Sequence, residues 1–175
     1  MTFAFDASPL NHFARAGHLH TLELVTKVGG RRVVTTAVLG ELKRGAQVDP
    51  ALLDIQSSDW LEEVHVNELG ELGVFAEYAR FLGSGDRHVG EASTLAWAEV
   101  HGATAIIDDR PGTLHGRRRG VSVHGSLWLI SNAYKASLLT ERAVTRLVDA
   151  LVDTEAWFPC NGDTFFSWGR ENGLL

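Results

Sequence analysis

Residues 3–10 read FAFDASPL, a short apolar run that ends at Asp6 and is followed by Ser8 and Pro9. Serine is favoured at the N-cap of a helix and proline at its first position, so this stretch predicts a β-strand followed by a helix, with Ser8 as the N-cap. A second stretch, residues 103–109, reads ATAIIDD and predicts a buried strand that ends in two acids. Both predicted strands therefore carry carboxylates at their carboxyl ends.

The rest of the chain alternates between short apolar or β-branched segments and segments with helical periodicity. Strands are expected at residues 31–36, 60–66 and 121–123, and a flexible loop at residues 83–86. Two consecutive helices, separated at Ala16 and Gly17, are expected within residues 10–25, and further helices at residues 67–82, 89–101, 126–135 and 140–152. Helical segments are also expected after Thr35 or Thr36 and from Asp49 onward. This alternation predicts an α/β fold in three α/β/α layers, with a mainly parallel central sheet covered on both faces.

Length and composition limit the class of protein. A chain of 175 residues with 45% hydrophobic residues is expected to form a single domain over residues 1–175, with a C-terminal helical tail over about 140–175. The net charge of -6 argues against a protein that coats nucleic acid over its whole surface. One cysteine, no secretory signal pattern and no apolar run of about 20 residues predict a soluble cytoplasmic protein without a membrane segment.

Two further acids are predicted to face inward from helices. Glu41 follows Ala37 and Val38 by four and three residues, so it shares their helix face. Glu91 precedes Leu95 by one turn and extends an apolar stripe. A buried carboxylate without a partner is costly, so it is normally protonated, paired or bound to a cation.

Taken together, these acids favour a cation site at the carboxyl edge of the sheet, where open α/β folds bind their ligands. Oxygen ligands without Cys or a convincing His spacing predict a hard ion, Mg²⁺ or Mn²⁺, which suits phosphodiester chemistry. The helix macrodipole also favours acids at helix N-termini, and it is a sufficient explanation for any one of them. It does not explain several acids that all lie at strand ends or on inward helix faces.

Four segments resemble the motifs of PIN-domain proteins, the nuclease fold of many bacterial toxin–antitoxin toxins. They are residues 5–10 (FDASPL), 38–42 (VLGEL), 90–93 (GEAS) and 106–110 (IIDDR), in the order and spacing of that family. The Gly-Glu-Ala and Asp-Asp-Arg motifs are similar to the branch of predicted nucleic-acid-binding PIN proteins. The resemblance runs over most of the chain.

The resemblance implies a metal-dependent endoribonuclease that uses Mg²⁺ or Mn²⁺ and cleaves RNA. Its acidic site would comprise Asp6, Glu41, Glu91, Asp108 and Asp109, and the metal ligands would be Asp6, Glu91 and Asp109, with the choice between Asp108 and Asp109 left open. Many members carry Asp where this chain has Glu91. The resemblance also implies a cognate antitoxin as a partner and allows a homodimer.

Candidate substrate-binding residues lie near these acids. Arg110 and the run Arg117, Arg118 and Arg119 follow the Asp pair and would contact RNA phosphates, although a solvated helix end explains the run equally well. Ser8 and Ser93 each follow a site acid by two residues and would bind a carboxylate or a water there.

Two other functions remain open from the sequence. One is a non-catalytic module that binds nucleic acid or a partner through the same fold. The other is an Asp-based phosphoryl-transfer protein, since such proteins also gather Asp at the carboxyl edge of a parallel sheet. The second is disfavoured because Asp6 has no neighbouring second Asp and the three lysines follow no clear late strand.

Overall fold

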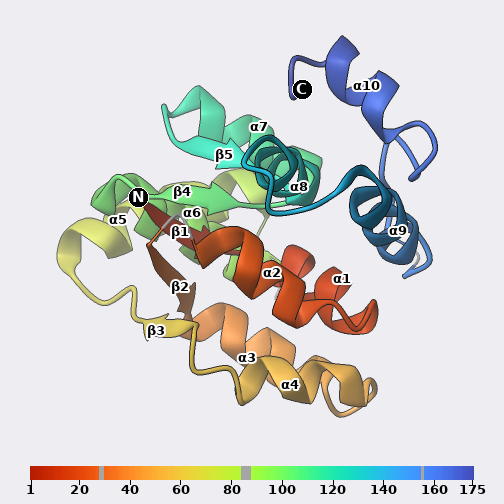
Figure 1. The fold of residues 1–175 in the computed structure, drawn as a ribbon. Helices are drawn as coiled ribbons and strands as arrows, with labels where there is room; N and C mark the ends of the chain where they lie inside the picture. Colours follow the sequence, from red (N-terminus) through yellow and green to blue (C-terminus); the bar gives the residue numbers. More distant parts are fainter. Residues whose placement is uncertain (28–29, 84–87, 155) are drawn as a thin grey trace.

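Five short strands form one sheet in which every pair of neighbours is parallel, in the order β3-β2-β1-β4-β5 (Figure 1). The structure is a computed structural model that describes residues 1–27, 30–83, 88–154 and 156–175. The strands are β1 (Thr2–Phe5), β2 (Arg31–Thr35), β3 (Glu62–Val64), β4 (Thr104–Ile106) and β5 (Ser122–His124).

Helices connect the strands and extend beyond the last one. They are α1 (Ala7–Arg15), α2 (Leu19–Thr26), α3 (Thr36–Gly45), the 3-10 turn η2 (Pro50–Leu52), α4 (Leu53–Gln56), α5 (Leu69–Leu82), α6 (Val89–His101), α7 (Arg110–Arg118), α8 (Ser126–Lys135), α9 (Glu141–Val152) and α10 (Phe165–Glu171). None of the helices within the described ranges is long and apolar enough to span a membrane.

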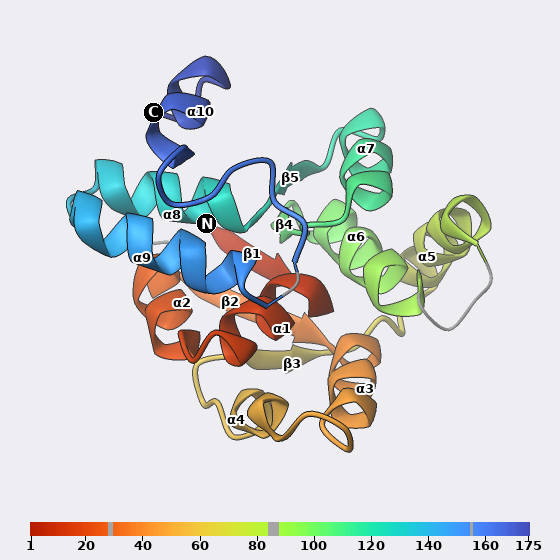
Figure 2. The same ribbon diagram turned by 90° about the vertical axis from the view of Figure 1, so that its right-hand side faces the viewer.

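The two faces of the sheet bury different side chains because successive strand residues point in opposite directions. Phe3 and Phe5 of β1 pack in one core with residues of α1, α2, α8 and α9. Ala4 of β1 and Val33 of β2 pack in the other core with residues of α5 and α6. Figure 2 shows α5, α6 and α7 on one side of the sheet and α1, α2, α8 and α9 on the other. The predicted three-layer α/β/α fold with a parallel central sheet is confirmed.

The strand order reverses between β1 and β4. From β1 the chain proceeds through β2 to β3 on one side, and β4 then returns to the other side of β1. The carboxyl ends of the two strands are in register at Phe5 and Ile106, and the Asp6 N–H donates to the Ile106 carbonyl at 3.0 Å. Such a switch point leaves a crevice at the carboxyl edge, which is where open α/β sheets bind ligands.

The helix after β1 begins differently from the sequence prediction. Asp6, and not Ser8, is the N-cap of α1, and its carboxylate accepts hydrogen bonds from the Ser8 N–H at 3.3 Å and the Ser8 hydroxyl at 2.7 Å. Ser8 lies inside the first turn, and Pro9 follows it there. An aspartate two residues before a free N–H makes the same bond as a serine cap, so the motif alone does not distinguish them.

Helix α7 was not predicted, because the sequence RPGTLHGRR shows little apolar periodicity. Its two buried glycines replace the usual apolar side chains. A Cβ at Gly116 would lie 2.6 Å from side-chain atoms of Leu95 and Val123, so only glycine allows α7 to pack this closely. The C-terminal tail, expected to be helical over about residues 140–175, contains α9 and α10. The predicted loop at residues 83–86 lies outside the described residues, apart from Gly83 at the end of α5.

Candidate active site

A small cavity of about 190 Å³ opens at the switch point of the sheet. Residues from four segments surround it: the start of α1, the second turn of α3, the first turn of α6 and the N-cap of α7. Its lining comprises Asp6, Ala7, Ser8, Asn11, Glu41, His88, Glu91 and Asp109. We call this the acid cavity.

Asp6 is held at the base of the acid cavity by its role as the N-cap of α1. Its side chain is buried, with 6% of the residue exposed, and its carboxylate accepts both hydrogen bonds from Ser8. Burial raises the pKa of Asp6, although the Ser8 bonds act in the opposite direction, and the negative charge of Asp108 raises it further. Ser8 therefore fixes the orientation of Asp6 without neutralising it.

Glu91 is a second buried acid of the cavity. It lies in the first turn of α6 with 5% of the residue exposed, and its Oε1 atom has no hydrogen-bond partner among the described residues. The His88 ring approaches at 3.6 Å, which is too long for a hydrogen bond. Burial, followed by the charges of Asp6 and Asp109, raises the pKa of Glu91 to about 8. The Gly112 N–H acts to lower this pKa, but no cation lies within hydrogen-bond distance among the described residues. A buried carboxylate without a close cation is energetically unfavourable unless it has a ligand.

Two glycines allow other elements to approach the glutamates. A Cβ at Gly112 would overlap the Glu91 carboxylate, so α7 can begin beside Glu91 only with glycine there. A Cβ at Gly90 would lie 2.8 Å from Glu41 Oε2, which explains how α3 and α6 come together at the cavity. Glu41 is half-buried; burial and the charge of Asp6 raise its pKa, whereas Arg44 lowers it.

The adjacent acids Asp108 and Asp109 have different surroundings. Asp109 is the N-cap residue of α7, its side chain makes no capping bond, and it lines the acid cavity. Asp108 instead accepts hydrogen bonds at 2.7 Å from both the N–H and the hydroxyl of Ser126, at the start of α8. Burial raises the pKa of Asp108 while the Ser126 bonds lower it. The geometry thus groups Asp109 with the other acids and gives Asp108 a capping contact with α8.

The predicted substrate-binding residues are spread over three places. Ser8 lines the acid cavity, whereas Ser93 faces the opposite side of α6, where its hydroxyl lies 2.7 Å from that of Thr35. Arg110 is exposed at the first position of α7. Arg117 donates two hydrogen bonds to the Val123 carbonyl, at 3.2 and 2.9 Å.

The arginine run does not line the acid cavity. Arg117 follows Asp109 by eight residues, a separation of about 12 Å along a helix axis. Arg118 is exposed on the last turn of α7. Arg119 binds Glu99 of α6 and Glu77 of α5. Two of the three arginines therefore make contacts that hold helices and strands together.

The sequence analysis missed Asn11 and His88. Asn11 follows Ala7 by four residues on α1, so both face the acid cavity, and its Oδ1 atom is buried without a hydrogen-bond partner in the described part of the chain. His88 precedes α6 as its N-cap. The four-residue spacing from Ala7 would have identified Asn11 as facing the site.

The donor set of the acid cavity fits a hard divalent cation. Within residues 1–27, 30–83, 88–154 and 156–175, no three acidic, His or Cys side chains lie close enough to form a compact metal cage. The cavity instead presents carboxylate oxygens around a central space, together with the unpartnered Glu91 Oε1 and Asn11 Oδ1. Mg²⁺ commonly binds through one or two carboxylates and retains several waters, so it needs no compact cage.

Comparison with known proteins gives one family and one related fold. A family model described as a PIN domain (DUF3368) matches residues 2–161. No curated protein matches the chain significantly. A solved structure of VapBC2 from Rickettsia felis, bound to a DNA fragment from their promoter, is similar with a TM-score of 0.50 and 15% sequence identity; the match covers 71% of this chain and 98% of that chain. At this identity the similarity supports the fold alone.

Proposed function

Because the chain belongs to the PIN-domain family, we propose that it is a metal-dependent endoribonuclease and the toxin of a toxin–antitoxin pair. The observation that carries the proposal is the acid cavity itself. Asp6, Glu41, Glu91 and Asp109 converge at the switch point of a parallel sheet, and the buried Glu91 Oε1 atom has no partner among the residues described. Carboxylates arranged in this way are stabilised by a cation.

In the proposed reaction, Asp6, Glu91 and Asp109 hold Mg²⁺ or Mn²⁺, with Ser8 keeping Asp6 in position. When bound, the cation would offset the charge of the carboxylates, lower the pKa of a water and balance charge on the phosphate. Glu41 stands at the rim of the acid cavity, half-buried and with a raised pKa, so it is suited to accept a proton from the attacking water. Water attack at phosphorus then breaks the bond to the leaving oxygen of the RNA.

The partners follow from the same proposal. The substrate is RNA. Arg110, exposed at the first position of α7 next to Asp109, would contact the RNA backbone at the site, and the exposed Arg117 and Arg118 in the last turn of α7 would contact it further away. A cognate antitoxin would control the activity, as in the toxin–antitoxin families that use this domain, and a homodimer is compatible with it. We expect the protein to act on RNA in the cytoplasm.

The experiment that tests the proposal incubates the purified protein with a mixed RNA pool in Mg²⁺, in Mn²⁺ and in EDTA. We expect cleavage with either metal, no cleavage in EDTA, and none with Asp6→Ala or Glu91→Ala in any condition. Cleavage that persists in EDTA, or that is unchanged in both variants, would contradict the mechanism. Circular dichroism of each variant separates loss of chemistry from loss of fold.

A second candidate is a non-catalytic module that binds RNA or a partner protein. Glu91 favours it, because it stands where many PIN-domain proteins carry Asp and so places its carboxylate at a different reach. RNA binding without any product in either metal would select this candidate. An Asp-based phosphoryl-transfer protein is a weaker third, since neither Lys27, Lys43 nor Lys135 lines the acid cavity.

A further inference from the structure

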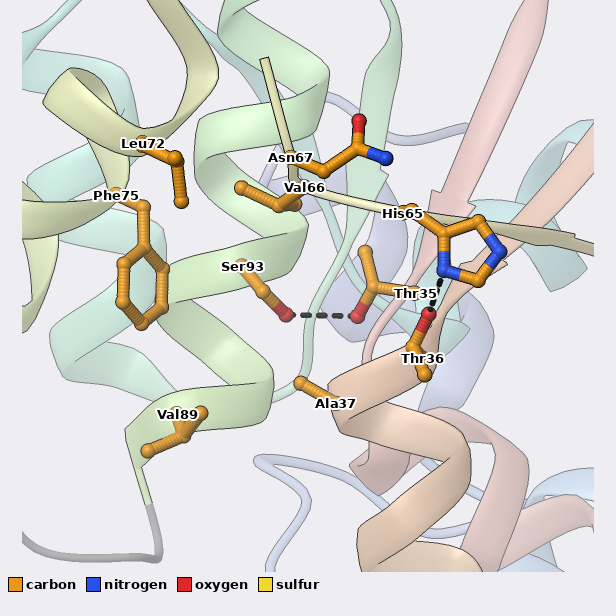
Figure 3. Close-up of a pocket in the computed structure, with 10 residues that line it drawn as sticks. All are labelled: Thr35, Thr36, Ala37, His65, Val66, Asn67, Leu72, Phe75, Val89 and Ser93. Atoms are coloured by element: carbon orange, nitrogen blue, oxygen red, sulfur yellow. Dashed lines mark hydrogen bonds between the residues drawn. The ribbon is translucent and has the colours of Figure 1, made fainter. Parts of the chain in front are cut away.

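A second cavity, of about 300 Å³, lies at the same edge of the sheet, beside the ends of β2 and β3. Thr35 and Thr36 line it from the start of α3, His65 and Asn67 from the segment after β3, and Phe75 from α5. Figure 3 shows these side chains around a common space. Its size falls at the lower end of the range typical of small-molecule sites.

One wall of this second cavity is apolar. Phe75 and Leu72 of α5 stand opposite the Thr35 and Ser93 side chains, and Val89 of α6 closes the lower side in the view of Figure 3. Phe75 is half-buried, so part of its ring is accessible. Leu72 and Val89 are 47% and 39% exposed, which is high for large aliphatic side chains. An unpaired planar group would find an aromatic ring and aliphatic contacts here.

The hydroxyls opposite Phe75 already satisfy each other. The Ser93 hydroxyl donates to the Gly90 carbonyl at 2.7 Å, so the Thr35 hydroxyl must be the donor in the 2.7 Å contact between the two. Thr35 Oγ1 in turn accepts from the Val38 N–H at 3.3 Å. Thr35 and Ser93 therefore form a fixed surface with little need for an added partner.

The rim of the cavity, in contrast, has unused hydrogen-bonding groups. His65 Nδ1 lies 2.7 Å from the Thr36 hydroxyl, which leaves its Nε2 atom open to a ligand. The Asn67 side-chain amide makes no hydrogen bond within the described residues, and Asn67 is exposed. An amide presents a donor and an acceptor side by side, as the edges of nucleobases do. The rim thus offers polar recognition above an apolar wall.

A hollow between α3 and α6 extends from this cavity toward the acid cavity. It shares Thr36, Ala37 and Val89 with the second cavity and continues along Gly40 and Gly90, the residues that directly precede Glu41 and Glu91. From Thr36 to Glu41 the distance along the α3 axis is about 7.5 Å. Arg44 lines the connecting hollow and is exposed. A cation therefore lies in this hollow, close to Glu41 of the acid cavity.

We propose that the second cavity binds one unpaired nucleobase of the RNA whose phosphodiester lies at the acid cavity. The inference rests on the proposed nuclease function and adds a base-selective subsite to it. The base stacks on Phe75, the rim groups of His65 and Asn67 contact its edge, and Arg44 contacts the intervening phosphate. Proteins read single-stranded RNA through this combination of stacking and edge contacts. The polar rim of the second cavity and the cation in the adjoining hollow favour a base over an apolar side chain from a partner protein.

The test measures binding of four short, unstructured oligoribonucleotides that differ only in the base at one central position. Fluorescence anisotropy is recorded on the Glu91→Gln protein in EDTA, so neither cleavage nor metal is needed. Each pocket variant, Asn67→Ala and Phe75→Leu, is made in that background. Phe81→Leu is the matched control, because Phe81 lies on the same helix, is 56% exposed and does not line the cavity.

We expect one base to be bound about fivefold or more tighter than the weakest, and Asn67→Ala to remove most of that preference. Phe75→Leu should weaken binding of all four oligonucleotides by about tenfold, with Phe81→Leu unchanged. Thermal unfolding of each variant shows whether the fold is retained, and Asn67→Ala, on an exposed side chain, keeps the test decisive if Phe75→Leu unfolds. Equal affinity for all four bases, or a preference that survives both pocket variants, would overturn the inference.

Cleavage by the wild-type protein separates the two proposals. If Mg²⁺ supports cleavage but the pattern of cut sites is the same in Asn67→Ala, Phe75→Leu and the wild type, the nuclease stands and the base subsite is wrong. If the base preference in binding depends on Asn67 and Phe75 but no cleavage occurs, the subsite stands and the nuclease is wrong. If Phe75→Leu weakens only the capture of a partner protein and not of RNA, the second cavity is a protein-binding site and the inference fails.

Discussion

Two groups of acids in this protein have opposite surroundings. On the layer formed by α5, α6 and α7, carboxylates are paired: Glu71 lies 2.7 Å from His101 Nε2, and Glu99 accepts two hydrogen bonds from Arg119. In the acid cavity, Asp6 and Glu91 are buried like Glu71, but within the described ranges no basic side chain lies within hydrogen-bond distance of them. Glu71, Asp6 and Glu91 are all buried carboxylates, so the two groups differ in whether a basic side chain pairs with the carboxylate.

The pKa values follow the partners. Burial acts to raise the pKa of Glu71, but the His101 bond and the backbone N–H groups of Glu68 and Asn67 hold it below its ordinary value. The Arg119 hydrogen bonds likewise lower the pKa of Glu99. In the acid cavity, burial raises the pKa of both Asp6 and Glu91. The paired acids thus contribute to the fold, whereas the unpaired acids reduce stability unless they bind a cation.

The largest expected effect separates the two groups by activity. Glu91→Gln removes a charge from the acid cavity with little change of shape, so we expect the rate of RNA cleavage in Mn²⁺ to fall by about 100-fold or more. Glu99→Gln alters a paired acid on the same helix, and its rate should stay within about threefold of the wild type at a temperature where both are folded. Single-turnover cleavage of one RNA measures both. Equal losses in the two variants would break the comparison.

The adjacent acids Asp108 and Asp109 allow the same comparison between a hydrogen-bonded carboxylate and one without a capping bond. Asp109→Asn should reduce cleavage by about 100-fold and leave stability unchanged, because its carboxylate makes no bond in the fold. Asp108→Asn weakens the two bonds to Ser126 and should lower the free energy of unfolding by about 1 to 2 kcal/mol, with a small effect on cleavage. Urea denaturation and cleavage assays of both variants provide the measurements. The reversed assignment would identify Asp108 as the site residue.

Removing the charge of a paired acid should lower the stability of the fold without changing the rate of RNA cleavage. The Glu71 carboxylate accepts hydrogen bonds from the N–H groups of Asn67 and Glu68 at 2.9 Å and also contacts the His101 ring. Glu71→Gln should therefore lower the free energy of unfolding by about 1 to 3 kcal/mol. The RNA cleavage rate of the folded variant should match the wild type. Urea denaturation at neutral pH is the measurement, and a stable but inactive variant would contradict the assignment.

The pH dependence of stability gives a further difference between the two groups of acids. The pKa of Glu91 rises from 4.5 to about 8 on folding, so the folded state binds this proton more tightly than the unfolded state. Its stabilisation is complete below about pH 4.5 and is lost as the pH rises through about 8. In EDTA, a shift of this size corresponds to about 5 kcal/mol, so this group should lower the Tm by about 10 °C across that window. Asp6 and Glu41, whose pKa values are also raised, act in the same direction.

Differential scanning calorimetry of a pH series checks this sign. The decline should be smaller in Glu91→Gln and unchanged in Glu62→Gln, whose side chain is exposed and pairs with Arg31 outside the acid cavity. A Tm that falls equally in both variants would show that Glu91 is not the group responsible.

Sequence patterns predicted the parallel sheet and the acids because both depend on local features. Apolar strands that end in Asp6 or Asp109 place those acids at one edge as soon as the strands are parallel. The sequence could not show which of Asp108 and Asp109 belongs to the site, because Asp108 is held by Ser126, which is distant in sequence. Helix α7 was missed because Gly112 and Gly116 are set by the closeness of α6 and β5, which no local pattern records. The second cavity was missed for the same reason, because it forms only where Leu72 and Phe75 of α5 come close to Thr35 and Ser93, which are distant in sequence.

The central claim is that the unpaired acids of the acid cavity form a divalent cation site. Electron paramagnetic resonance of free Mn²⁺, titrated with protein above the pKa of Glu91, tests it without RNA. The account predicts saturable binding by the wild type, the same binding by Glu99→Gln, and a loss of affinity of about tenfold or more in Glu91→Gln. No saturable binding by the wild type, or equal affinity in Glu91→Gln, would contradict it.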